Sequence, residues 1–193
     1  MRMKYPGKPT MLSRTDWDTK EENKGNLDKG NTPEYIIVHH TGDTNDELAK
    51  KYGTDDKGFF KREQEIQMEA GYGDIAYNFG IGIGANILEG RNPTYRGGHI
   101  KTQDGISNGN TLGVVVLGNY EIRDFKSSQK TALINLLAYL CYEYNIHPSK
   151  IKGHRDVNTG TYATVCPGKN IYRELSSIRD EVCYKLWPDF KPY

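Results

Sequence analysis

His154 and Cys166 carry side chains that can hold a metal ion, and His39 is a third residue of this kind in a distant part of the chain. His154 and Cys166 enclose eleven residues rich in Thr, Gly and Asn, a composition that favours a loop over a helix. Such a loop can bring an imidazole and a thiolate to the same point. Zinc prefers these two ligand types, and a third ligand such as His39 would leave the fourth tetrahedral position open for water. The pattern therefore predicts a catalytic zinc site.

The strands that would position these residues can be read from hydrophobic runs. A continuous apolar run rich in β-branched residues ends at His39, which predicts a buried central strand with the histidine at its carboxyl end. In α/β proteins the chemistry is found at such strand ends. A second run of this kind predicts another buried strand, and two shorter runs predict strands around the turn at 82–84. The strands are expected at 34–39, 74–81, 85–89 and 111–117.

Apolar residues at three- and four-residue intervals predict the helices. The longest is expected to begin with Ser127 or Ser128 as its N-cap. Strands interleaved with helices predict an α/β fold with one domain, in which helices flank a central mixed β-sheet. The irregular stretch 90–109 is expected to form a loop lining a groove. The helices are expected at 45–52, 57–70, 127–144 and 170–185.

Length and composition limit the possible functions. A chain of 193 residues fits one domain. The domain is expected over 34–187, after a polar lead-in at 1–33 whose Trp17 packs on the domain body, and before a tail at 188–193. Twenty-six basic against 25 acidic residues give no basic footprint for nucleic acid. No apolar stretch is long enough for a membrane span. We expect no nucleic-acid or membrane partner, and we expect the protein to be a monomer. The three cysteines, Cys141, Cys166 and Cys183, are expected to be free thiols.

Several short motifs occur together in one order along the chain. In combination they resemble the zinc-dependent N-acetylmuramoyl-L-alanine amidases, a family that includes amidase-type phage lysozymes and the peptidoglycan recognition proteins. The resemblance extends from about Leu12 to about Leu175. Any one motif alone would be a weak signal. The motifs are IIVHHTG (36–42), DIAYNFGI (74–81), EGR (89–91), GGH (97–99), NTLGVVVLGNY (110–120), GHRDV (153–157) and CPG (166–168).

The resemblance implies roles for the metal ligands and for two further residues. The family's three zinc ligands fall on His39, His154 and Cys166, although any one of these alone would more simply be a core or surface residue. Tyr77 matches the family's catalytic tyrosine, whose phenol can donate a hydrogen bond to the oxyanion of an attacked amide. Its plain alternative is a buried strand tyrosine. Thr164 stands where phage relatives carry a lysine, so a hydroxyl donor would replace a cation.

Four further residues are assigned to substrate binding. His99 lies in the GGH motif, where family members have a histidine lining the groove. Asn110 and Arg91 are candidates for hydrogen bonds to sugar or peptide, and for Arg91 an ion pair with a carboxylate is an equal alternative. His40 is the fourth residue assigned to substrate binding, and its alternative role is packing beside the metal. The interval between His154 and Cys166 is longer than in the phage lysozymes, which implies an altered loop.

These assignments imply a zinc hydrolase that cleaves the amide bond between N-acetylmuramic acid and L-alanine of peptidoglycan. A non-catalytic muropeptide-binding module is one alternative, and Cys166 argues for catalysis because binding-only recognition proteins have lost that ligand. A cytoplasmic muropeptide-recycling amidase is another. The start of the sequence lacks the apolar run of a secretory signal. We therefore expect cytoplasmic synthesis, and action on the cell wall after release or delivery.

Overall fold

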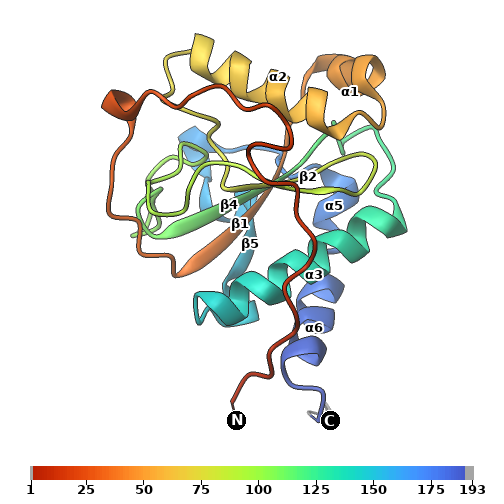
Figure 1. The fold of residues 1–193 in the computed structure, drawn as a ribbon. Helices are drawn as coiled ribbons and strands as arrows, with labels where there is room; N and C mark the ends of the chain where they lie inside the picture. Colours follow the sequence, from red (N-terminus) through yellow and green to blue (C-terminus); the bar gives the residue numbers. More distant parts are fainter. Residues whose placement is uncertain (1, 190–193) are drawn as a thin grey trace.

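A five-stranded mixed sheet forms the centre of the structure, which is a computed structural model describing residues 2–189 (Figure 1). The strand order is β3-β2-β4-β1-β5. β1 pairs in parallel with β4 and β5, β2 pairs in parallel with β4, and β3 is antiparallel to β2. This confirms the predicted α/β class. The strands are β1 (Tyr35–His40), β2 (Phe79–Ile81), β3 (Ile87–Glu89), β4 (Thr111–Val116) and β5 (Ile151–Gly153).

Strand β1 lies between β4 and β5, and its residues from Ile36 to Val38 are apolar because both faces of the strand are covered. Ile36 and Val38 point into the larger core beneath α3 and α6, while Ile37 belongs to a smaller cluster on the opposite face. Side chains alternate between the faces of a strand, so His39 shares the face of Ile37. The sheet therefore presents His39 on the face away from α3 and α6.

Helices cover both faces of the sheet (Figure 1). α3 and α6 pack on one face, and α2 covers the other with Phe59 and Phe60, which are fully buried. None of the helices in residues 2–189 is long and apolar enough to cross a membrane. The helices are α1 (Glu47–Tyr52), α2 (Asp56–Glu69), α3 (Ser127–Glu143), α4 (His154–Val157), α5 (Lys169–Tyr172) and α6 (Leu175–Leu186), with 3₁₀ turns at Lys24–Asn26, Thr44–Asp46, Pro148–Lys150 and Gly160–Tyr162.

The lead-in segment packs against the edge of the sheet. Leu12 forms a β-bridge with Leu88 of β3. Trp17 is only 2% exposed, packs edge-on against Phe60 and donates from its indole nitrogen to the carbonyl of Glu89 at 2.9 Å. The predicted packing of Trp17 on the domain body is confirmed. Of the predicted tail at 188–193, residues 190–193 lie outside the described residues.

The predicted strand at 74–81 is wrong in its first half, because only Phe79–Ile81 joins the sheet. Side chains and neighbouring backbone together satisfy the backbone of the earlier residues: the Tyr77 carbonyl accepts from the Arg91 backbone nitrogen at 2.8 Å, and the Asn78 backbone nitrogen donates to the Gly113 carbonyl at 2.9 Å. The guanidinium of Arg91 donates to the carbonyls of Asp74 and Ile75 at 2.8 and 2.7 Å. The amide of Asn78 accepts from the backbone nitrogen of Gly113 at 2.9 Å. The chain before β2 is therefore an irregular segment held in place from its flanks.

Three other boundaries differ from the sequence-based expectation. α3 has Lys126 as its N-cap, and the side chain of Gln129 accepts from the Lys126 backbone nitrogen, so neither serine caps the helix. The last predicted helix is divided into α5 and α6 by a turn at 173–174. The predicted loop between His154 and Cys166 is not wholly irregular, because it begins in the single helical turn of α4 and contains a 3₁₀ turn at Gly160–Tyr162. Elements of three or four residues are too short to show a period in sequence.

Candidate metal centre

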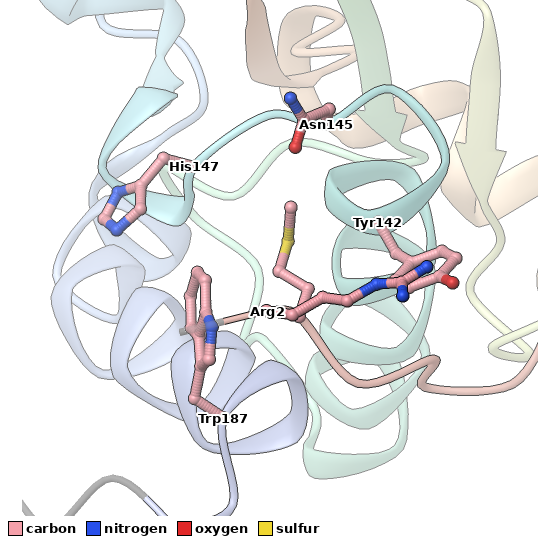
Figure 2. A pocket seen from close by; sticks show the side chains of 6 residues that line it. Arg2, Tyr142, Asn145, His147 and Trp187 are labelled. Carbon is pink, nitrogen blue, oxygen red and sulfur yellow. The ribbon is translucent and has the colours of Figure 1, made fainter.

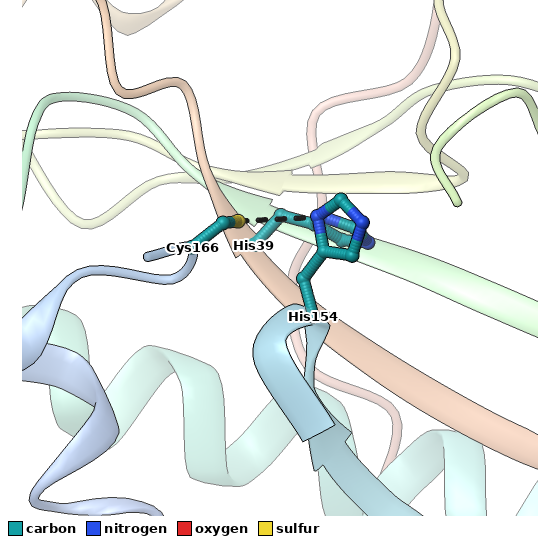
Figure 3. A group of neighbouring side chains, drawn as sticks. All are labelled: His39, His154 and Cys166. Atoms are coloured by element: carbon teal, nitrogen blue, oxygen red, sulfur yellow. Dashed lines mark hydrogen bonds between the residues drawn. The ribbon is translucent and has the colours of Figure 1, made fainter. Parts of the chain in front are cut away.

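Two neighbouring strands bring the three predicted metal ligands together (Figure 3). His39 lies near the end of β1, and His154 directly follows β5, which runs parallel to β1. The carboxyl ends of the two strands are therefore adjacent, and the loop before α5 brings Cys166 to the same point. One ligand atom from each residue lies within 4.8 Å of the other two. Two imidazoles and one thiol with this spacing fit the ligand set of a zinc ion.

Backbone contacts hold Cys166 in place. Its sulfur accepts a hydrogen bond from the backbone nitrogen of His40 at 3.4 Å and lies 3.6 Å from Nδ1 of His39. Its own backbone nitrogen donates to Oγ1 of Thr164 at 3.1 Å, so Thr164 shapes the turn that presents the sulfur. Burial raises the pKa of the Cys166 thiol to about 12. Metal binding would therefore have to displace the thiol proton.

A chain of hydrogen bonds fixes which nitrogen of His39 faces the cysteine. The hydroxyl of Thr111 donates to the carbonyl of Ser107 at 2.9 Å, since a carbonyl can only accept. The Thr111 oxygen must then accept from Nε2 of His99, 3.3 Å away. His99 Nδ1 is left as the acceptor for Nε2 of His39 at 2.9 Å. His39 therefore keeps a bare Nδ1 towards Cys166, which is the form that binds a metal.

The electrostatic environment keeps both ligand imidazoles neutral. Burial lowers the pKa of His39 well below its usual value, and the neighbouring histidines lower it further. Burial also lowers the pKa of His154, which is only partly buried. The rings of His39 and His154 lie 4.6 Å apart, centroid to centroid. Neutral imidazoles are the form that coordinates zinc, so the site is prepared for the ion at neutral pH.

Tyr77 lies beside the ligands, in the irregular segment before β2. Its ring centroid is 5.2 Å from that of His39 and 6.3 Å from that of His99, on which it stacks. Burial raises the pKa of Tyr77 well above its usual value, and the charge of Glu63 raises it further. The phenol therefore keeps its proton and can donate a hydrogen bond at the edge of the site.

The residues assigned to substrate binding lie in different places. His99 is 6% exposed and touches both His39 and a pocket beside the centre. His40 turns away and accepts from the Tyr120 backbone nitrogen through Nδ1 at 3.0 Å, and burial lowers its pKa to about 4. Arg91 is 4% exposed, with its guanidinium bonded to three backbone carbonyls. The Asn110 side chain bonds to the backbone of Ser107 and Gly105 within its own loop.

A pocket of about 300 Å³ adjoins the metal centre. It is formed by the segment after His99 on one side and by the loop after α4 on the other, with His154 on its wall. Its lining residues include Tyr72, Lys101, His154, Asn158, Thr161 and Tyr162. The chain can therefore hold a ligand directly beside the three candidate metal ligands.

A second pocket, of about 470 Å³, lies at the other end of the sheet (Figure 2). It lies between the ends of α3 and α6 and the start of the chain, where Tyr142 and Trp187 flank it. His147 is near the amino end of β5, whereas the candidate metal ligands lie at the carboxyl ends of β1 and β5. This pocket is therefore remote from the candidate chemistry.

Sequence reading missed one buried carboxyl group near the site. Glu63 of α2 is 8% exposed and accepts from Nε2 of Gln67 at 2.8 Å. Gln67 in turn accepts from the backbone nitrogen of Ala76, next to Tyr77. Burial raises the pKa of Glu63 to about 7, and Asp43 raises it as well. The spacing of Glu63 from Phe59 and Phe60, on the apolar face of the helix, is a sequence signal that could have revealed it.

Sequence reading also missed two residues that hydrogen-bond around the candidate ligands: Thr111, which bonds to His99, and Asn158, which bonds to His154. Thr111 opens a buried strand and is fully buried, while Asn158 follows α4 and is 1% exposed. Asn158 is four residues after His154, a spacing that brings two side chains to one side of a helical turn. Its Oδ1 lies 2.9 Å from His154 Nε2.

Comparison with known proteins agrees with this arrangement. A sequence profile of the family described as N-acetylmuramoyl-L-alanine amidase matches residues 29–169. The chain is 31% identical over 183 residues to peptidoglycan-recognition protein LB of Drosophila melanogaster, covering 93% of this chain and 69% of the fly protein.

Solved structures have the same fold. The endolysin N-acetylmuramoyl-L-alanine amidase LysCS of Clostridium intestinale superimposes with a TM-score of 0.67 at 28% identity, over 89% of this chain and 96% of that one. A variant of the Drosophila recognition protein LB in complex with tracheal cytotoxin superimposes with a TM-score of 0.69 at 28% identity, over 94% and 96%. The fold, the matched profile and the sequence identity together establish that the chain belongs to the N-acetylmuramoyl-L-alanine amidase family.

Proposed function

We propose that the protein is a zinc-dependent hydrolase that cleaves the amide bond between N-acetylmuramic acid and L-alanine in peptidoglycan. The observation that carries this proposal is the convergence of His39, His154 and Cys166, whose ligand atoms lie within 4.8 Å of one another beside an open pocket. A protein that only bound muropeptides would need the pocket but not the three ligands. The intact ligand set therefore favours catalysis.

The side chains around the centre have distinct tasks in this proposal. When bound, zinc supplies Lewis-acid polarisation of the amide carbonyl and an activated water. Tyr77 donates a hydrogen bond from its phenol to the oxygen that becomes negative in the transition state. Thr164 is assigned as a second donor: its oxygen accepts from the Cys166 backbone nitrogen, and that bond does not use its hydroxyl proton. His99 and Thr111 keep His39 in the metal-binding tautomer.

Relatives support a peptidoglycan fragment as the substrate. One neighbour in structure is an endolysin amidase, and another was solved with tracheal cytotoxin bound. In this chain the pocket beside His154 would take the peptide next to the scissile amide. All the residues invoked come from one chain, so we propose that the monomer is the active unit.

The test measures zinc content and amide cleavage on the same samples. We expect about one zinc ion per chain and release of new L-alanine amino termini from purified cell walls. Cys166→Ser and treatment with a chelator should each remove both properties. A metal-free protein that binds muropeptides tightly without cleaving them would instead establish a binding module.

We further propose that the enzyme acts lytically, on the cell wall, after release from the cell that makes it or delivery by it. The similarity to an endolysin amidase supports this setting. Added protein should reduce the turbidity of a suspension of bacterial walls. Cleavage confined to small soluble muropeptides, with intact walls left untouched, would indicate a recycling enzyme.

A further inference from the structure

The buried side chain of Asn158 uses its full hydrogen-bonding capacity. Its Oδ1 accepts from the backbone nitrogen of Lys101 and lies near Nε2 of His154, both at 2.9 Å. Its Nδ2 donates to the carbonyls of Lys101 and Val157 at 2.8 and 3.1 Å. A carboxamide offers two acceptor sites and two donor protons, and here all four are engaged. Such a group has one orientation only.

This orientation determines the tautomer of His154. The paired bonds to the backbone of Lys101 identify the oxygen and nitrogen of the Asn158 amide, since a backbone N–H must meet oxygen and a carbonyl must meet nitrogen. The oxygen towards His154 can only accept, so His154 Nε2 carries the proton. The other ring nitrogen, Nδ1, is then bare and available to a metal.

The same residue connects His154 to the opposite wall of the pocket. The segment 101–106 and the loop 158–163 are joined twice, by the Asn158–Lys101 pair and by Gln103 with Thr159. Gln103 Nε2 donates to Thr159 Oγ1 at 2.9 Å, and the Thr159 backbone nitrogen donates to Gln103 Oε1 at 3.0 Å. Only the first of these pairs also touches a candidate metal ligand. The two junctions can therefore be tested separately.

We propose that Asn158 is a positioning residue for the metal centre, which holds His154 with Nδ1 bare and fixes that ring to the 101–106 wall of the substrate pocket. This inference rests on the proposed zinc function for its consequence, although not for its geometry. Partners that orient a metal-ligating histidine typically change metal affinity 10–100-fold when they are removed.

The experiment measures zinc affinity by competition with a chromogenic chelator, and the His154 tautomer by ¹⁵N NMR of the zinc-free protein. Asn158→Leu has a similar size and removes all four bonds, and we expect about 10–100-fold weaker zinc binding with loss of the uniform Nε2–H tautomer. Asn158→Asp loses the donations of Nδ2 to the carbonyls of Lys101 and Val157 but keeps the acceptor facing His154, so it should retain the tautomer and bind zinc more tightly than Asn158→Leu. If the leucine variant does not fold, the His154 tautomer in the aspartate variant still tests the inference.

Gln103→Leu is the matched control, because it breaks the other junction and leaves the Asn158–His154 bond intact. Its zinc affinity should stay within about twofold of the wild type, well below the loss of about 10–100-fold expected when a ligand's own partner is removed. Equal loss in Gln103→Leu and Asn158→Leu, or an unchanged tautomer in Asn158→Leu, would overturn the inference. Wild-type protein that binds no zinc would refute the proposed function instead, while the tautomer measurement would still decide the role of Asn158.

Discussion

Replacing Thr111 with valine tests the hydrogen-bond chain that orients His39. Valine has the shape of threonine without the hydroxyl, and Thr111 is fully buried at the start of β4. The substitution removes the acceptor for His99 Nε2 without opening a cavity. His99 must then bury an unpaired N–H or move its proton to Nδ1, where it would donate to His39. In the second case His39 carries its own proton on the nitrogen that faces Cys166.

The expected magnitude follows from the buried donor. A buried N–H left without a partner costs about 1–3 kcal/mol. Zinc binding requires a bare Nδ1 on His39, and in the valine variant this form leaves the Nε2–H of His99 unpaired. The free energy of zinc binding should therefore become less favourable by this amount. That range corresponds to about 5- to 140-fold in zinc affinity. The His99–Thr111 contact is 3.3 Å, which is long for a hydrogen bond. We therefore expect a loss of about tenfold, near the lower end of the range.

Zinc affinity of Thr111→Val should be compared with that of Thr111→Ser by chelator competition, with thermal unfolding of the zinc-free proteins measured in parallel. Serine keeps the hydroxyl and should bind zinc within about threefold of the wild type, since the acceptor remains. Wild-type affinity in the valine variant would refute the deduced tautomers. Equal weakening in both variants would point to a loss of packing and not of the hydrogen bond.

Three further predictions concern the surroundings of the site. Tyr77→Phe should lower kcat about 10²–10³-fold with zinc content unchanged, and unaltered turnover would exclude Tyr77 from the mechanism. Glu63→Gln should stabilise the protein at pH 8 by at most about 3 kcal/mol. The reason is that burial raises the pKa of Glu63 to about 7, so the wild type loses stability as the pH rises from about 4.5 to 7. Urea unfolding should show no gain in stability at pH 4, and a gain that is the same at both pH values would contradict the prediction. Gly113→Ala should weaken zinc binding, since an added Cβ would lie 2.6 Å from the His99 ring. Gly80→Ala is the control: its Cβ would crowd Phe60 of α2, so it should destabilise the fold but retain zinc affinity. Equal losses of zinc affinity in the two variants would refute the prediction.

The candidate metal ligands could be predicted from sequence because they depend on residue type and strand position. His39 ends a long apolar run, and such a run predicts a buried strand whatever its neighbours are. The motifs around His154 and Cys166 then supplied the remaining ligands. The parallel pairing of β1 with β5 was not predicted, since β5 has only three residues.

The partners of the ligands were beyond sequence reading because they depend on contacts between distant segments. His99 was expected to contact substrate, and it also holds His39 across 60 residues of chain. Asn158 was read only as part of a longer loop, although its bonds to Lys101 connect segments 57 residues apart. The roles assigned to Arg91, Asn110, His40 and Thr164 stay predictions, and in the structure their polar groups bond to nearby backbone.

The placement of the ligands on β1 and just beyond β5 has a consequence for the order in which the protein is made. His39 leaves the ribosome early, while its sulfur partner is 127 residues further along. In the proposed zinc enzyme, a nascent chain that ends before Ile151 would hold one of the three candidate ligands and could not form the metal site. The ion could therefore stabilise the fold only after the chain has been made as far as Cys166, at a late stage of synthesis.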